Sequence, residues 1–228
     1  MVGAENDHDK SHLTSDSDFE KYYKASPILR SQERVVLFRA PPSGWEQSYT
    51  RCMTSDFMKV REDGTVIRTI SFYGQGIYRE NYGLVKLKVL LRVRTNSQHE
   101  TFLDALEISD NEPEVFPLVE EQTPEQRPSK PSRPARVVPR SIQGAAGILY
   151  HEGVNVFQVL FAHPSCILLG EPRENGRYSC TLWAVESAIK TLPSCCKFSF
   201  FALCYNQAYK AYETDSRYCP LLAKQHSN

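Results

Sequence analysis

Seven cysteines are the residues of this chain whose type and spacing point to a definite chemistry. Six of them crowd into the stretch from Cys166 to Cys219, and the pair Cys195-Cys196 fits no common zinc-ligand spacing. Cysteines crowded in this way are typical of disulfide bonds, which persist in an oxidising compartment. A reduced protein with buried free thiols is the alternative, although such thiols rarely cluster. The sequence therefore predicts a disulfide-bonded, secreted, extracellular protein with no metal site and no cofactor.

The same cysteines are poor candidates for catalysis. None lies in the local context of a known nucleophile, and disulfide bonding would consume most thiols that His99, His151 or His163 could activate. The run Gly74-Gln75-Gly76 is not followed by a helical pattern, so it does not indicate a phosphate-binding loop. The sequence predicts a binding protein and not an enzyme.

Length and charge narrow the range of partners. The 228 residues suit one domain, and 27 basic against 27 acidic residues give a net charge of zero, which supplies no field to steer nucleic acid or an anionic membrane. No run of about 18 apolar residues exists that could span a bilayer. Met1 to Lys10 is polar and acidic, which indicates a mature form with an added Met or an incomplete N-terminus. We expect a monomer without nucleic-acid or membrane partners.

Strands are the main elements that position the cysteines. In residues 84–94 aliphatic residues alternate with Lys86, Lys88, Arg92 and Arg94, which indicates a strand with one packed and one solvated face. The basic face could bind an anionic partner, although a simply solvated face is more common. Further strands are predicted at 35–38, 49–60, 65–73, 146–151, 154–162, 166–169 and 177–185. Residues 101–109 fit a helical turn or a strand, and we favour a strand or irregular segment there.

Helices are predicted near both ends. Ser15 to Asp18 offers N-caps for a short helix through Tyr23, which should stop before Pro27, and Pro193 can begin a C-terminal helix. About eight antiparallel strands with an outer helix favour a closed barrel over a sandwich. The predicted fold is all-β: an eight-stranded antiparallel barrel with a short N-terminal helix and a C-terminal helix packed outside. The apolar stripe expected on that last helix consists of Phe198, Phe201, Ala202 and Tyr205.

One segment does not fit a barrel wall. Seven of the 14 prolines lie between Asn111 and Arg140, with acidic residues first and basic residues after them. Such a composition cannot pair into a sheet, so it indicates a mobile loop that is a tolerated insertion or docks on another protein in polyproline form. We therefore divide the chain into a disordered segment at 1–15 and a barrel domain at 16–228 with a Pro-rich insertion at 111–142.

The order of the motifs resembles a known family. Ser165-Cys166, Cys180-Thr181-Leu182-Trp183 and the run from Val185 through Leu192-Pro193 to Cys195 precede Cys204 and Cys219, and the N-terminal half adds Val35 to Ala40 and Arg51-Cys52. Together these motifs resemble the tick salivary lipocalins, the histamine-binding protein family, over residues 16–219 apart from the insertion. The resemblance implies a lipocalin barrel and no catalysis. It also implies the disulfides Cys52–Cys219, Cys166 with Cys196 or Cys195, and Cys180–Cys204, and we expect one of the vicinal cysteines to be unpaired.

The resemblance further implies capture of a small host mediator, since members of the family sequester histamine, serotonin, leukotrienes or thromboxane and some bind complement proteins. In the family's amine-binding signature an Asp follows the strand cysteine and a Glu precedes Leu-Trp, whereas Ile167 and Thr181 occupy those places here. An ammonium needs such carboxylates and aromatic faces. The carboxylates left for an amine are Glu80, Glu107 and Glu152, flanked by Trp45, Tyr78 and Trp183, although lone carboxylates near turns are usually solvated.

An apolar ligand needs an apolar lining and a cation for its polar end. Aromatic residues that could line the barrel are Phe38, Phe57, Phe72, Tyr73, Phe157 and Phe161, and the candidate cations are Arg39, Arg51 and Arg79. We predict a secreted lipocalin that sequesters an apolar or lipid-type mediator, a fatty acid or an eicosanoid. The alternatives are a biogenic amine, histamine or serotonin, and a complement-type host protein bound by the outer surface. The candidate ligand-binding residues are Phe38, Trp45, Phe72, Tyr78, Glu80, Glu152, Phe157 and Trp183.

Overall fold

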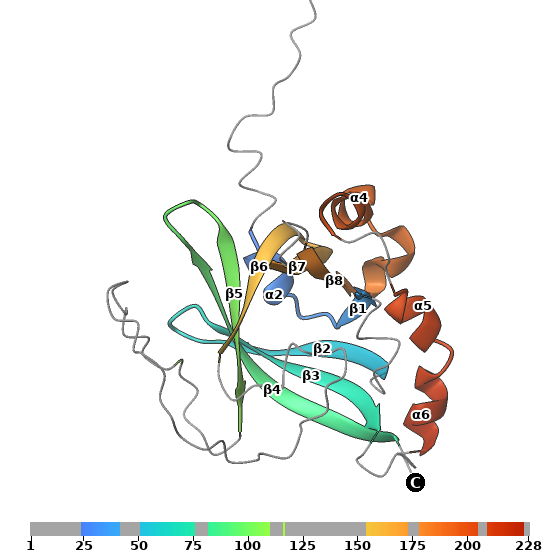
Figure 1. The fold of residues 1–228 in the computed structure, drawn as a ribbon. Coiled ribbons are helices and arrows are strands. Elements are labelled where there is room, and N and C mark those ends of the chain that lie inside the picture. The colour runs from blue at the N-terminus through green and yellow to red at the C-terminus, as the bar shows by residue number, and fades with distance from the viewer. Residues whose placement is uncertain are drawn as a thin grey trace, which may run out of the picture.

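The computed structural model describes residues 24–41, 51–75, 82–109, 116, 154–172, 178–204 and 209–225. Within these residues eight strands form one sheet (Figure 1). The strands are β1 (Val35–Arg39), β2 (Arg51–Val60), β3 (Val66–Gln75), β4 (Tyr82–Thr95), β5 (Thr101–Ile108), β6 (Val154–His163), β7 (Cys166–Pro172) and β8 (Tyr178–Val185).

The sheet closes on itself. Each strand pairs antiparallel with the next, and β1 pairs with β8 through Val35 opposite Val185. Alternate side chains of each strand point into the barrel, because the side-chain period of a strand is two residues. On β4 the inward row is the aliphatic row of the sequence pattern, with Val89 and Leu91 fully inside the core. The predicted all-β, eight-stranded antiparallel barrel is confirmed.

One end of the barrel, which we call the floor, carries the three short turns β2–β3, β4–β5 and β6–β7 and the helix α2 (Ser26–Leu29). Ile28 and Leu29 of α2 are buried. Pro27 lies in the first turn of α2, where a missing N–H costs no hydrogen bond, and α2 is a helix that was not predicted from the sequence. The connections at the opposite end, the helix predicted from Ser15 to Tyr23 and the strand predicted at 146–151 lie outside the described residues.

After β8 the chain forms η1 (Glu186–Thr191), α4 (Ser194–Leu203), α5 (Ala211–Asp215) and α6 (Cys219–Gln225), and Figure 1 shows the three α-helices along one side of the barrel. Helix α4 packs on the outer wall of β6, β7 and β8 through Cys196 and Phe200, and Cys204 follows at the same spacing. The predicted apolar stripe was wrong, because Phe198 and Phe201 are 73% and 58% exposed. The disulfides of Cys196 and Cys204 hold the face of α4 that carries these cysteines against the wall, so Phe198 and Phe201 point away from it.

Three disulfides join the C-terminal helices to the barrel strands. They cross Cα–Cα distances of 5.7, 6.3 and 5.8 Å. Each contributes about 2–5 kcal/mol to stability, and the contribution is larger when the bond closes a longer loop. The pairs are Cys52–Cys219, Cys166–Cys196 and Cys180–Cys204, which are pairs that the resemblance implies, and Cys195 is a half-buried free thiol.

The outer face of β3, β4 and β5 has its own apolar cluster of Ile67, Leu90 and Ile108, against which Phe116 packs. Phe116 is the one described residue of the Pro-rich insertion, and the segment 1–15 lies outside the described residues. No helix among the described residues is long and apolar enough to cross a membrane.

The basic row of β4 lies on this outer face. Arg92 and Arg94 both donate to Asp104 of β5, with shortest N···O distances of 2.9 Å. Asp104 is buried, so the two guanidinium groups provide the partners that a buried carboxylate requires. Arg92 and Arg94 of the basic row are therefore engaged in an ion-pair cluster on the outer face.

Candidate ligand-binding site

A cavity of about 70 Å³ lies inside the barrel next to the floor. Its lining is apolar apart from Ser55, Arg68 and Thr181. The volume suits one end of a ligand, since pockets that enclose a whole drug-sized molecule measure about 300–1,000 Å³. Apolar side chains that line it include Leu29, Val35, Leu103, Phe157, Ile167 and Trp183.

Strand register brings these residues together. On β7 and β8, Ile167 lies opposite Trp183 and Leu169 lies opposite Thr181. On the other side of the barrel Arg68 of β3 lies opposite Val89 of β4. All six of these side chains line the cavity. Residues an even number of positions apart on one strand point to the same side of the sheet, as Ile167 and Leu169 do.

Arg68 is the charged residue among the described residues that line the cavity, and only 2% of its surface is exposed. Its Nε donates to Ser55 Oγ (2.9 Å), and its Nη atoms donate to the carbonyl oxygens of Leu29 (3.0 Å), Ser31 (2.8 Å), Glu33 (3.1 Å) and Ser55 (2.8 Å). These five bonds use the full donor set of a guanidinium. Arg68 thereby fastens α2 and the residues after it over the end of the barrel.

The charge of Arg68 is not matched by an ion pair with any described carboxylate. Asp56 lies nearby on β2 but pairs with Arg34, at 2.8 Å. Burial lowers the pKa of the Arg68 guanidinium to about 10, and the charge of Asp56 acts in the opposite direction. Neutral oxygens satisfy the hydrogen bonds of Arg68, and no described carboxylate lines the cavity, so the lining carries a net positive charge.

Two hydroxyl groups complete the polar lining. Ser55 Oγ accepts from Arg68 Nε, and Thr181 Oγ1 accepts from Trp183 Nε1 at 3.2 Å. Within the described residues neither hydroxyl donates a hydrogen bond. Each is therefore fixed as an acceptor by a neighbour and retains a proton that it can donate.

The predicted ligand-binding residues separate into three groups. Phe157 and Trp183 line the cavity, and Phe72 is buried in the same interior core. Phe38 was a wrong choice: it alternates with the inward Leu37, so it faces outward and packs in the cluster beneath α4. Trp45, Tyr78, Glu80 and Glu152 lie outside the described residues.

The remaining candidate lining and charged residues also divide between the interior, the outside and the residues that are not described. Phe57 packs against the interior, whereas Phe161 faces α4, because the register of β6 shifts between Val159 and Phe161. Arg39 binds Glu213 on the outside at 2.7 Å, and Glu107 is exposed. Arg79 lies outside the described residues.

Sequence reasoning missed Arg68, although a signal was present. It stands in the row Val66, Arg68, Ile70 and Phe72, three apolar residues that alternate with it on β3. An arginine within an inward apolar row must be buried and must find several acceptors. That pattern singles out Arg68, whereas the candidate cations Arg39 and Arg51 do not line the cavity.

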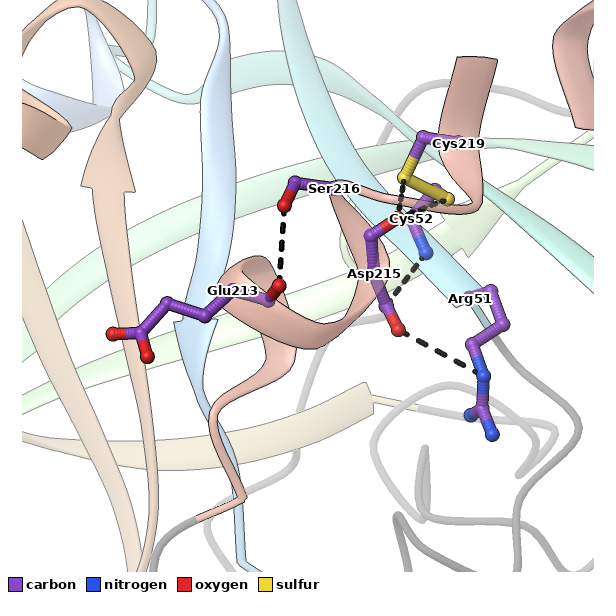
Figure 2. The surroundings of a disulfide bond; sticks show 6 residues. All are labelled: Arg51, Cys52, Glu213, Asp215, Ser216 and Cys219. Carbon is purple, nitrogen blue, oxygen red and sulfur yellow. Dashed lines mark hydrogen bonds and ion pairs between the residues drawn. A yellow bond between two sulfur atoms is a disulfide. The ribbon is translucent and has the colours of Figure 1, made fainter. Parts of the chain in front are cut away.

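A second polar region, which we call the outer junction, lies where β2 meets α5 and α6 (Figure 2). Cys52, bonded to Cys219, adopts a left-handed φ of 59°, and its N–H donates to Asp215 Oδ2 at 2.8 Å. Arg51 Nε lies 3.7 Å from Asp215 Oδ1. Burial raises the pKa of the Asp215 carboxyl, although the Cys52 N–H, Arg51 and Tyr209 act against this shift.

The outer junction borders a groove of about 530 Å³ on the outside of β1, β2 and β3. Tyr73, expected in the barrel lining, lies in this groove instead, beside Lys86. Charges of both signs line it, including Arg34, Asp56 and Glu186, so it has no single electrostatic preference. Arg51, a candidate cation for the barrel, belongs to the outer junction and not to the cavity.

A closed eight-stranded antiparallel barrel with an apolar internal cavity and a helix bonded to its outer wall defines a lipocalin-type binding protein. The family model described as tick histamine binding protein matches residues 15–218. The chain therefore belongs to the tick histamine-binding protein family, and the resemblance drawn from the motifs is confirmed.

A solved structure supports the same fold. Japanin from Rhipicephalus appendiculatus, determined bound to cholesterol, is similar to this chain with a TM-score of 0.50 and 12% identity. The match covers 81% of this chain and 95% of Japanin. No curated protein sequence matches the chain.

Proposed function

We propose that this protein is secreted and sequesters an apolar, lipid-type host mediator, a fatty acid or an eicosanoid, in its barrel. The observation that carries the proposal is the lining of the cavity: apolar side chains surround one buried cation, Arg68, and no described carboxylate lines the cavity. The three disulfides support an extracellular location, because such bonds persist outside reducing compartments.

The same lining disfavours a biogenic amine. Ile167 and Thr181, at the places of the family's acidic residues, both line the cavity with neutral side chains. An ammonium there would lose its hydration without gaining a counter-charge, and it would be repelled by Arg68. A fatty acid or an eicosanoid is longer than this cavity of about 70 Å³, so it would place only one end there.

The test is binding of a ligand panel to the intact chain by native mass spectrometry and thermal shift. We expect palmitic acid and leukotrienes to bind and to raise the melting temperature, and histamine and serotonin to have no effect. Ala105→Leu, which fills the cavity, should weaken lipid binding at least tenfold, whereas Thr54→Leu in the outer groove should leave it unchanged. Tighter binding of either amine than of every lipid would overturn the proposal.

A second candidate function is binding of a complement-type host protein by the outer surface. The observation that favours it is the exposure of Phe198 and Phe201 on α4, because large exposed aromatic side chains are common in protein interfaces. Phe198→Ser with Phe201→Ser, or deletion of 111–142, should then abolish capture of complement proteins without changing lipid affinity. Capture that survives both changes would exclude this candidate.

A further inference from the structure

We propose that the ligand is a carboxylate and that it enters the barrel carboxylate first, toward Arg68, Ser55 and Thr181. This inference rests on the proposed function and specifies both the polar group of the ligand and its direction in the barrel. The hydrocarbon part would then extend past Phe157 toward the end of the barrel opposite the floor.

The first argument is charge. Arg68 is 2% exposed and lines the cavity, and among the described residues it forms no ion pair with a carboxylate. Its five hydrogen bonds end on neutral oxygens, four of which are backbone carbonyls. A buried charge interacts strongly with an opposite charge placed in the same low-dielectric space. A ligand carboxylate in this cavity would supply that missing charge without displacing any of the five bonds.

The second argument is hydrogen bonding. The hydroxyls of Ser55 and Thr181 line the cavity, and their acceptor roles are taken by Arg68 Nε and Trp183 Nε1. Each can offer only its proton to a ligand, so the cavity presents donors and a positive charge. A carboxylate accepts from both kinds of group, whereas an alkyl end accepts from neither. A hydrocarbon end at the floor would leave the two donors without acceptors, which costs free energy.

The direction of the ligand can be measured through Trp183, which lines the cavity. The chain has two tryptophans, so Trp45→Phe makes Trp183 the sole source of indole fluorescence. Stearic acid with a nitroxide quencher at carbon 5 should quench Trp183 at least twice as strongly as stearic acid labelled at carbon 16. Equal or stronger quenching by the carbon-16 probe would overturn the direction, while failure of stearic acid itself to bind would overturn the proposed function.

The polar group can be tested with a shape-preserving variant. Thr181→Val keeps the side-chain volume and removes one donor to the ligand, together with the acceptor of Trp183 Nε1. We expect about tenfold weaker binding of palmitic acid and less than twofold change for its methyl ester, because loss of the Trp183 hydrogen bond affects both ligands alike. Thr69→Val, at a buried outward hydroxyl, is the matched control and should change neither. An equal loss for acid and ester, or no loss for the acid, would overturn the inference while leaving lipid binding intact.

Ser55→Ala is a second variant that also removes an acceptor of Arg68. We expect it to weaken palmitic acid more than Thr181→Val does, because it removes a donor and disturbs the neighbouring cation. Ser71→Ala on the outer face of β3 is its control. Unchanged palmitic acid affinity in a folded Ser55→Ala protein would exclude Ser55 from the site.

Discussion

Arg68 at the floor and Asp215 at the outer junction are both almost fully buried, at 2% and 3% exposure, but they are stabilised differently. Arg68 is held by five hydrogen bonds to neutral oxygens and by no disulfide bond. Asp215 accepts from the backbone of Cys52, has Arg51 at 3.7 Å, and lies beside the Cys52–Cys219 disulfide. The floor is therefore held by hydrogen bonds, whereas the junction relies on a covalent bond.

The difference follows from what a barrel can offer to each charge. A guanidinium needs acceptors, and the carbonyl groups of the irregular chain after α2 are free to turn toward Arg68. A carboxylate needs N–H donors, which strands use for pairing with each other. Cys52 can donate its N–H to Asp215 because the register of β2 shifts between Arg51 and Thr54. One distorted residue supplies only one such donor, so the cation is better satisfied than the anion.

The largest effect should come from breaking the covalent bond of the junction. Cys52→Ser with Cys219→Ser removes a link across a sequence separation of 167 residues, for which loop entropy gives a loss of about 5 kcal/mol in the free energy of unfolding. The control is Cys180→Ser with Cys204→Ser, at a separation of 24, with an expected loss of about 3.5 kcal/mol. Urea denaturation measures both, and an equal or larger loss in the control would contradict the prediction.

The next effect tests the floor. Arg68→Met keeps much of the side-chain volume but leaves the carbonyls of Leu29, Ser31 and Glu33 without their donor. We expect the free energy of unfolding to fall by about 3–4 kcal/mol, as is typical when a buried hydrogen-bond network is broken. Arg34→Met, which removes an exposed ion pair with Asp56, should lower it by less than about 1 kcal/mol. Similar losses in the two variants would show that Arg68 is not the main support of the floor.

The floor and the outer junction differ in how much of each the sequence predicts. Alternating residues identify the strands because one face of each strand is buried, and the cysteine order that resembles the family implies the pairings at the junction. The face of α4 could not be predicted from its apolar residues, because the bonds of Cys196 and Cys204 to the wall orient the helix. Phe161 was misplaced because its outward position depends on a register shift that residue types do not encode.

Arg68 teaches the opposite lesson, because its place in an apolar row was visible and only its partners were not. Those partners are the backbone carbonyl oxygens of Leu29, Ser31 and Glu33. Because every residue has a backbone carbonyl, residue types do not show which carbonyl groups a side chain reaches. The barrel class was predictable from the sequence, whereas the presence of an open cavity was not. Which side chains point into it required the register of each strand.

A smaller effect should follow from placing carboxylates at the floor, so that it comes to resemble the junction in charge. Ile167→Asp with Thr181→Glu introduces two acidic groups into the cavity near Arg68. We expect histamine binding to appear, at least tenfold tighter than in the unchanged protein, and palmitic acid affinity to fall, because the cavity would then repel a carboxylate. Isothermal titration measures both, and Thr54→Glu in the outer groove is the control. Unchanged preferences would mean that cavity charge does not select the ligand.

The smallest predicted effect is a pH dependence at the junction. Because burial raises the pKa of Asp215 above its ordinary value of 3.8, the folded state binds the Asp215 proton more tightly than the unfolded state. As the pH falls toward 3.8 through the raised pKa, the wild-type protein should gain stability relative to Asp215→Asn. Urea denaturation at several pH values between 7 and 4 measures this difference.

Glu213 provides a control of opposite sign on the same helix. The hydrogen bond from Arg39 lowers the pKa of Glu213 below its ordinary value of 4.5, although burial acts in the opposite direction. Its stabilising contribution is present above pH 4.5 and is lost as the pH falls through the lowered pKa, so the wild-type protein should lose stability relative to Glu213→Gln. If both variants diverged from the wild type in the same direction, the pH response would belong to the helix as a whole. Opposite directions would instead assign the pH response to the burial of Asp215, which is the less completely satisfied of the two buried charges, Arg68 and Asp215.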